Sequence, residues 1–447
     1  MFRKFFTYQI FLVIVLSFII LILFGSLLRH HYLGGERFKS LQKIAVTFSS
    51  VPTNLKRMIE LKTINLDKIQ TLEKHKDKDR FVRFLKKKRN ALLVLPRYII
   101  DETRSVVDVI DLNTFEVIHT YKHDIEKMNL RIKNINEHPR INIDHTPTRF
   151  QYRHPLILED GSLISVYGPI YKIDFCSNLK WINDEDHFHH SQMLDHEGNI
   201  WVGGQLRPHS KFIEKYKVKN YMDDSIVKFN LDGNILLNKS VTEILIENEI
   251  IFENFALRSS LKNVSDPIHL NDIEPVLKDS KFWKKGDLFL SLRDLSTIIH
   301  YRPSLNKVIK IITGPFSMQH DVDIISDKEI SIFNNNNFLE NNQHSEVLVF
   351  DYETDSFTKL FNRQLQEEDF KTFTAGVSHI FKDGSLMVDE SNHSRIILFN
   401  NQGEKEWEFI NKDKNGNIGF MHWSRVIEDE LFINKYKSII KNIKCTN

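Results

Sequence analysis

A unit of two consecutive hairpins repeats along most of this chain. After Ala91, short apolar runs alternate with turn dipeptides such as Asp-Gly and Asn-Gly, as in LILEDGSLISV, QMLDHEGNIWV and HIFKDGSLMV. Runs of this kind, bounded by such turns, are typical of antiparallel strands. Four strands in each repeat make one blade of a β-propeller, so the repetition predicts an all-β propeller. A β-sandwich is the alternative, but it does not explain the repetition.

The repeats predict a ring of six blades. Five full units lie between Leu156 and Ile410. A sixth is assembled from both ends of the domain, from VVDVIDLNTFEVIHTY near Val106 and a strand around Trp423 to Ile433. Joining the two ends in one blade closes the ring and leaves no free sheet edge. We therefore expect a six-bladed β-propeller over residues 91–447.

The N-terminus predicts a membrane anchor over residues 1–35. No charged residue occurs from Phe5 to Leu28, and a run of this length spans a bilayer as a helix. The main alternative is a cleaved signal peptide, but Gly25-Ser26 is followed by Leu-Leu-Arg-His-His, a poor cleavage site. Positive charges lie on both sides, so orientation is weakly specified. A single-pass protein whose soluble part faces the periplasm or cell exterior is expected.

A helical spacer is predicted between anchor and propeller, over residues 36–90. The stretch is rich in Lys, Leu, Ile and Glu and contains one proline, Pro52. Residues 54–59 and 80–88 have apolar side chains at helical spacing.

Charge and cysteine content exclude two classes of protein. The chain has 61 basic and 59 acidic residues and a formal net charge of +2, which gives no overall attraction to nucleic acid. Its 2 cysteines, Cys176 and Cys445, could pair only across most of the chain. A disulfide framework is therefore excluded, and the redox compartment stays open.

Histidines recur just before the predicted first strand of each blade, where a propeller opens its central channel. They are His154, His190, His269, His320, His379 and His422. Arg293 ends a second strand, which returns to the same face. We expect these groups to converge at the channel mouth.

Such a cluster suits an anionic substrate. Neutral imidazole is a nucleophile and general base, while imidazolium and guanidinium groups bind oxyanions. Two other interpretations are open: the histidines are ordinary turn and core residues, or residues 187–190 form part of a metal site. Metal sites usually add carboxylates or thiols at a defined spacing, so no metal is predicted.

Several segments resemble the bacterial arylsulfate sulfotransferases, which take a sulfuryl group from an aryl sulfate and not from a nucleotide donor. DPIHLNDIEPVLKDSKFWKKGDLFLSLRDLS (266–296) is similar to that family's His-x-Asn segment and a strand ending in Ser-x-Arg. GPFSMQHDVDIISDKEISIFNNN (314–336) is similar to its Gln-His segment and a strand ending in Phe-Asp-Asn. FHHSQMLDHEGNIWV resembles its upstream His segment, and the likeness covers about residues 150–427.

The resemblance implies a six-bladed propeller with its active site at the channel mouth. It implies that His320 is the nucleophile, carrying the sulfuryl group as a sulfohistidine. His269, Asn271 and Arg293 match other catalytic positions, and His190 matches the upstream histidine, with His189 as its rival. No cofactor is implied; the partners are a small-molecule aryl sulfate and a phenolic acceptor. The candidate substrate-binding residues are His189, His379, His422, Arg425 and Asn334, and Glu390 and Asn392 are expected at the rim.

Three departures keep other functions open. The insert KDSKFWKKG is longer than the family's, an anchor and spacer replace a separate N-terminal β domain, and the disulfide that some members carry near the site has no counterpart. The main alternative is a non-catalytic propeller that binds a sulfated or phosphorylated glycan, lipid or peptide. A structural protein or a hydrolase is the third. Donor, acceptor and oligomeric state are not specified.

Overall fold

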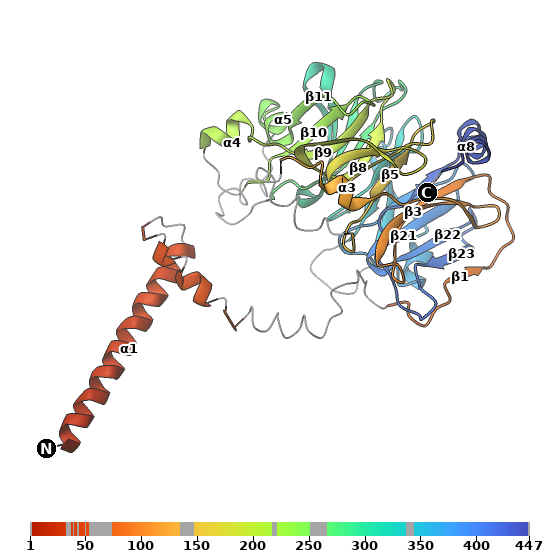
Figure 1. Cartoon of the computed structure of the whole chain (residues 1–447). Coiled ribbons are helices and arrows are strands. Elements are labelled where there is room, and N and C mark those ends of the chain that lie inside the picture. The colour runs from red at the N-terminus through yellow and green to blue at the C-terminus, as the bar shows by residue number, and fades with distance from the viewer. Residues whose placement is uncertain are drawn as a thin grey trace. The chain divides into compact units, whose positions relative to one another are not determined.

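The computed structural model describes residues 2–32, 37–38, 40–42, 44–49, 51–52, 74–134, 147–216, 221–250, 266–336 and 344–445. The chain divides into two compact units, Met1–Leu66 and Asp67–Asn447. Figure 1 traces the elements of both along the chain.

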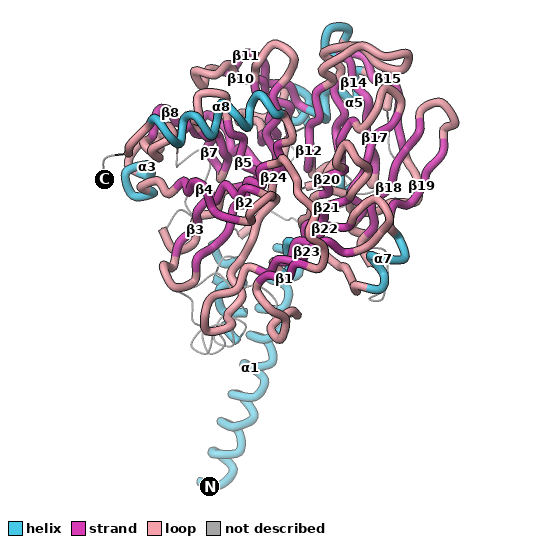
Figure 2. The backbone as a smooth tube through the Cα atoms, turned by 90° about the vertical axis from the view of Figure 1, so that its right-hand side faces the viewer, coloured by secondary structure: helices cyan, strands magenta, loops and turns pink. Residues whose placement is uncertain are grey.

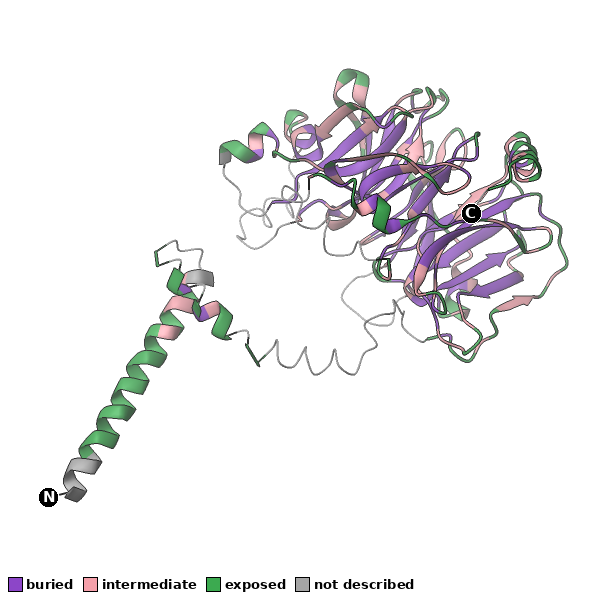
Figure 3. Cartoon of the chain, viewed as in Figure 1, coloured by how far each residue is buried: buried purple, intermediate pink, exposed green. Residues whose placement is uncertain are grey.

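The first unit contains one long helix, α1 (Phe2–Tyr32). Its segment Tyr8–His30 is long and apolar enough to cross a membrane, by length and composition, and none of it is buried. Figure 3 shows that the helix is largely exposed and that the strands of the second unit are largely buried. A membrane anchor and a signal sequence both have this composition.

The second unit is an all-β, propeller-like arrangement whose described strands form five antiparallel sheets. The first sheet is β24 (Arg425–Ile427), β2 (Leu92–Ile99), β3 (Arg104–Asp111) and β4 (Glu116–Tyr121). The second is β5 (Arg153–Ile157), β6 (Leu163–Val166), β7 (Gly168–Ile173), β8 (Leu179–Leu194), β9 (Ile200–Gln205), β10 (Asp224–Phe229) and β11 (Ile235–Ser240). The third is β12 (Leu270–Pro275), β13 (Leu288–Leu292), β14 (Thr297–Arg302) and β15 (Lys307–Ile312). The fourth is β16 (Val322–Ile324), β17 (Glu329–Asn334), β18 (Glu346–Asp351) and β19 (Ser356–Leu360). The fifth is β20 (Ser378–Ile380), β21 (Leu386–Glu390), β22 (Arg395–Phe399), β23 (Lys405–Ile410) and β1 (Phe81–Arg83).

The predicted count of six separate blades therefore differs from the hydrogen bonding. Strand β8 runs on for 16 residues, pairing with β7 near its start and with β9 near its end, and so joins two hairpin repeats into one sheet of seven strands. The repeats did not reveal this, although the residues between them contain no turn dipeptide that would break the strand.

The two ends of the second unit meet in one sheet, as the sequence predicts. β24 pairs with β2 through Leu92, Leu93 and Val94, and Figure 2 shows the two strands side by side. The predicted C-terminal strand to Ile433 is wrong beyond Ile427, because Asp429 accepts a hydrogen bond from Phe432 N at 2.7 Å and starts a helix. The short helices are α3 (Ile125–Asn129), α4 (Lys211–Tyr216), α5 (Val241–Glu247), α7 (Asn362–Glu367) and α8 (Glu430–Asn442).

The spacer prediction is only partly matched. Residues 40–42, 44–49 and 51–52 are helical, whereas the expected helix over 54–59 lies outside the described residues. Residues 80–88 are not a helix, since β1 pairs with the edge strand β23. Phe81 stacks on Phe115 with ring centroids 3.8 Å apart. Over so short a stretch, apolar spacing does not separate helix from strand.

Ion pairs to two buried carboxylates hold the residues before β1 against the fifth sheet. His75 Nε2 lies 2.8 Å from Glu390 Oε2, and Lys78 Nζ lies 2.6 Å from Glu408 Oε1. Arg395, whose side chain is fully buried, contacts both carboxylates, at 2.6 Å and 3.1 Å. Glu390, expected at the rim, is thus part of this ion-pair cluster.

Buried aspartates tie successive sheets together. In each case the carboxylate accepts a hydrogen bond from a backbone N–H at or next to the first strand of the following repeat. The pairs are Asp224 with Leu270, Asp272 with Val322, Asp321 with Ser378, and Asp389 with Ser424, at 2.7, 3.1, 3.1 and 2.8 Å. These bonds link one sheet to the next.

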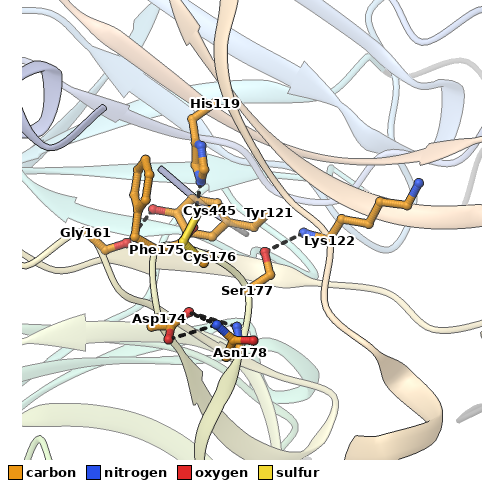
Figure 4. Close-up of a disulfide and its surroundings, with 10 residues drawn as sticks. All are labelled: His119, Tyr121, Lys122, Gly161, Asp174, Phe175, Cys176, Ser177, Asn178 and Cys445. Atoms are coloured by element: carbon orange, nitrogen blue, oxygen red, sulfur yellow. Dashed lines mark hydrogen bonds between the residues drawn. A yellow bond between two sulfur atoms is a disulfide. The ribbon is translucent and has the colours of Figure 1, made fainter. Parts of the chain in front are cut away.

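A disulfide closes the second unit at its C-terminal end. Cys176, in the turn between β7 and β8, is bonded to Cys445 beyond α8, 269 residues away. Figure 4 shows the bond beside His119, Tyr121 and Phe175. His119 stacks on Phe175 with centroids 3.9 Å apart. The one pairing open to the two cysteines is therefore formed.

Candidate active site

Four histidines surround the indole ring of Trp423. The ring centroids of His154, His190, His320 and His422 lie 5.6 to 5.8 Å from that of Trp423. A fifth histidine, His269, joins the group through His190, with centroids 5.1 Å apart. Five of the six histidines singled out in the sequence are thus brought together, although they come from widely separated repeats.

Three of these histidines have left-handed backbone conformations. The φ angles of His154, His190 and His269 are 40°, 64° and 54°. Each stands at or beside a register shift of its sheet, in the β5–β6, β8–β9 and β12–β13 ladders. Such conformations cost about 1–3 kcal/mol each and are found mainly where function needs a particular side-chain direction.

His320 is held with one ring nitrogen free. Its Nδ1 lies 2.6 Å from Oδ1 of Asn335 and 3.2 Å from the carbonyl oxygen of Met318. Asn335 in turn donates from Nδ2 to the carbonyls of Thr372 and Ala375, each at 2.9 Å. Because both neighbours of Nδ1 are acceptors, the proton is on Nδ1 and the lone pair is on Nε2. That Nε2 is buried and has no partner among the described residues.

Burial keeps four of these histidines uncharged. It lowers the pKa of His320 to about 3, a shift opposed by the hydrogen bond to Asn335 and reinforced by the charges of Arg293 and His269. Burial also lowers the pKa values of His154, His190 and His422 well below the ordinary histidine value. A neutral, dehydrated imidazole is a nucleophile or proton carrier, not a fixed positive charge.

Charged groups stand at one side of this neutral cluster. His269 Nδ1 lies 2.5 Å from Asp266 Oδ2, which directs its other nitrogen away from the carboxylate. Burial acts to raise the pKa of Asp266, but the bond from His269 and the charges of His269, His189 and Arg293 outweigh it and lower the pKa. Arg293 Nε donates to Asp294 at 2.8 Å, and its positive charge reaches both Asp266 and His320.

Asn271 supports the chain segment that carries His320. Its Nδ2 donates to the carbonyl of Gln319 at 2.9 Å, and its Oδ1 is buried with no partner among the described residues. Gln319 Nε2 is itself bonded to the carbonyls of Leu292 and Thr297. Asn271 therefore lies within the site, with one N–H bond already made to the protein.

Other predicted substrate residues lie elsewhere. His379 binds Glu428, with Nε2 and Oε2 3.2 Å apart, and shows no ring contact with the cluster among the described residues. Arg425 is half-buried, and its guanidinium donates to the carbonyls of Pro155, His154 and Gln192. Burial lowers the pKa of Arg425, while nearby carboxylates, Asp323 first, act to raise it.

Asn334 and Asn392 shape loops. Asn334 accepts from the backbone of Ser317 and Asn336 and donates to Glu346. Asn392 accepts from Thr372, Phe373 and Thr374 and so fixes the loop that carries the carbonyl partners of Asn335.

Three residues of the cluster were not predicted from the sequence: Trp423, Asn335 and Asp266. Asn335 stands one position after the predicted Asn334, and the Asn-rich run after β17 gave no reason to choose between them. Trp423 follows His422 directly, and a single tryptophan before a strand is more often core than site.

The described part of the chain contains no group of three or more His, Cys, Asp or Glu side chains arranged to hold a metal ion. The run 187–190 is thus not such a group in the structure.

Comparison with known proteins adds a family to this geometry. No curated protein matches the chain. Among solved structures, a protein of unknown function from Bacteroides caccae has 11% identity and a TM-score of 0.46, covering 76% of this chain and 100% of its own. A streptogramin B lyase has 9% identity and a TM-score of 0.41, covering 78% and 97%. At these values the two carry no argument about function.

The sequence profile of the arylsulfotransferase (ASST) family matches residues 155–412, more than half of the chain. The matched region contains His190, His269, Asn271, Arg293 and His320. The chain belongs to the arylsulfotransferase family.

Proposed function

We propose that this protein moves a sulfuryl group from an aryl sulfate to a phenolic acceptor, through a sulfohistidine formed on Nε2 of His320. The observation that carries the proposal is the state of that nitrogen: it has a lone pair, is buried and has no hydrogen-bond partner in the part of the chain that the structure describes. Membership of the arylsulfotransferase family supports the same reaction class.

Each half of the reaction is a displacement at sulfur. In the first, Nε2 of His320 bonds to sulfur as the bond from sulfur to the aryl oxygen breaks. In the second, the phenol oxygen of the acceptor bonds to sulfur as the sulfur–nitrogen bond breaks. Arg293 and His269 would stabilise the sulfuryl oxygens, which carry the negative charge of the transition state. A covalent intermediate of this kind gives two-stage kinetics.

The main alternative is a propeller that only binds an anionic glycan or lipid at the mouth. A pure anion site gains from fixed positive charge, but four histidines of this cluster have lowered pKa values. The long insert does not close the site either. Trp283 is 2% exposed and packs on Phe289 and Tyr352, in the hairpin that joins the far end of β12 to β13.

A donor assay on the full chain in detergent tests the proposal. p-Nitrophenyl sulfate is supplied with and without phenol, to the wild type and to His320→Ala. Nitrophenol release that depends on phenol and is lost in the variant supports the transferase, and a sulfated His320 peptide by mass spectrometry identifies the intermediate. His379→Ala is the matched control, expected to keep full activity. Release without phenol would indicate a sulfatase, and no release from a folded protein across several donors would favour the binding protein.

We infer the location and blade number on separate grounds. The disulfide is of a kind that persists in oxidising compartments, which supports a soluble part outside the cytoplasm, held by an uncleaved α1. Protease accessibility in intact cells, with carbonate extraction of membranes, tests both points.

The division of β8 between two hairpin repeats supports a ring of six four-stranded units.

A further inference from the structure

His189 and His190 are adjacent in sequence, yet their rings are in contact. The two Nδ1 atoms lie 2.7 Å apart. In a regular strand, successive side chains point to opposite faces of the sheet. Here the β8–β9 register shifts between His189 and Gln192, and His190 has a φ of 64°. This bulge turns the His190 ring towards the ring of His189.

The other nitrogen of His189 faces a buried carboxylate. Its Nε2 lies 3.5 Å from Oδ1 of Asp224. Asp224 is 1% exposed, and its Oδ2 accepts a hydrogen bond from Leu270 N at 2.7 Å. A Cβ at Gly203 would lie 3.0 Å from Cε1 of His189, so the ring packs directly on the glycine backbone. His189 is thus hydrogen-bonded to His190 and lies at ion-pair distance from Asp224, although its Nε2 makes no hydrogen bond among the described residues. His190 lies beside His320 and His269, whose centroids are 6.4 and 5.1 Å from its own.

The short contact between the two Nδ1 atoms allows two proton arrangements. A hydrogen bond needs one donor and one acceptor, so one Nδ1 carries a proton and the other has its lone pair. If His189 is the donor, His190 carries its proton on Nε2, the nitrogen not used in the contact. If His190 is the donor, its Nε2 has a lone pair. The two arrangements present the site with a proton donor and a proton acceptor, respectively.

We propose that Asp224, His189 and His190 are a proton relay that protonates the departing aryl oxygen and later accepts the proton of the acceptor phenol. This role rests on the proposed sulfuryl transfer. His190 is the group that meets the substrate oxygen, and His189 and Asp224 are positioning residues that act through it.

The protons balance over the two half-reactions. In the first, the aryl oxygen takes the proton from Nε2 of His190, while Nδ1 of His190 takes the proton from Nδ1 of His189. His189 passes from imidazolium to neutral imidazole and keeps the proton on Nε2 that faces Asp224. In the second, the phenol proton goes to Nε2 of His190, and the Nδ1 proton returns to His189. No outside acid or base is consumed.

The surroundings favour this division of roles. His189 faces Asp224 and lies within the charge field of Asp266. Burial, followed by the charges of His189, His269, Arg153 and His320, lowers the pKa of His190. His190 thus stays neutral, because it gains a proton on one ring nitrogen as it gives up the proton on the other. The carboxylate of Asp224 stabilises the positive charge on His189.

Leaving-group dependence separates this relay from a structural role. The full chain and its Asp224→Asn and His189→Gln variants are assayed with p-nitrophenyl sulfate, whose phenolate leaves without a proton, and with phenyl sulfate, whose phenolate is far more basic. General acid catalysis contributes about 10²–10⁴-fold when the leaving group needs a proton. We expect kcat/KM for phenyl sulfate to fall about 100-fold or more, and that for p-nitrophenyl sulfate to fall less than about 5-fold. His187→Gln, on the same strand, is expected to change neither.

Equal losses on both donors, or no loss on either, would overturn the relay while leaving the transferase in place. If the wild type transfers no sulfuryl group from any donor, the proposed function fails and the relay with it. Asn keeps an acceptor for Leu270 N, so Asp224→Asn retains the local fold; should it unfold, His189→Gln carries the same comparison.

Discussion

Oδ1 of Asn335 lies 2.6 Å from Nδ1 of His320, and the amide that carries it is locked by two bonds to backbone carbonyls. A flip of the Asn335 amide would place its N–H groups against the imidazole of His320 and its oxygen against the two backbone carbonyl oxygens. The tautomer of His320 is therefore set from the loop before β20.

Replacing Asn335 by Leu should lower the rate of sulfohistidine formation at least about tenfold, since neutral imidazole then populates both tautomers and the ring loses its orientation. Asn335→Asp gives the sharper test. A carboxylate beside Nδ1 raises the pKa of His320 from its value of about 3. The acid limb of kcat/KM should move to higher pH in this variant; an unchanged pH profile would contradict the contact.

Removing the charge of Arg395 should lower the free energy of unfolding more than removing any other single charge. Its fully buried guanidinium contacts Glu390 and Glu408. Arg395→Met leaves both carboxylates without this partner, and breaking a buried pair costs about 3–5 kcal/mol. Urea unfolding measures the loss, with Arg363→Met, which is exposed and pairs with Glu367, as the control expected to lose less than about 1 kcal/mol. Residues 74–78 should become protease-sensitive in the Arg395 variant alone.

Asp389 should make stability depend on pH. Burial raises its pKa from 3.8 to about 7, against the bonds from Ser424. Between these values the folded state holds more protons than the unfolded state, so this group's contribution is full below about pH 4 and is lost as pH rises to about 7.

Asp389→Asn removes that titration and keeps an acceptor for Ser424 N. Relative to wild type, the free energy of unfolding of the variant should rise by about 2–4 kcal/mol between pH 4 and pH 7.5. The buried histidines titrate in both proteins and cancel in the difference. A difference that does not vary with pH would rule out the raised pKa.

The disulfide should stabilise the second unit. Removing a native disulfide costs about 2–5 kcal/mol, and the loop closed by Cys176 and Cys445 is long. Cys445→Ser should therefore lower the melting temperature, and reductant should lower that of the wild type to the same value. Equal melting of all samples, with or without reductant, would mean that the bond does not form in the native protein.

The sequence by itself determined the all-β repeat architecture, the apolar N-terminal helix, the family and the histidines that precede each first strand. These follow from local patterns: turn dipeptides at fixed offsets, an uncharged apolar run, and motifs in a set order. Of the histidines named on that basis, only His379 lies away from the cluster.

Only the tertiary structure decided which groups act on one another. Asn335 and His320, or Asp224 and His189, are linked by hydrogen-bond distance across different strands, and no spacing along the chain encodes that distance. The same holds for β8, whose continuity merges two repeats, and for Arg425 and Glu390, whose charges are taken up by buried partners. Side-chain direction in this ring depends on local bulges and positive φ angles, which neighbouring strands impose and periodicity does not reveal.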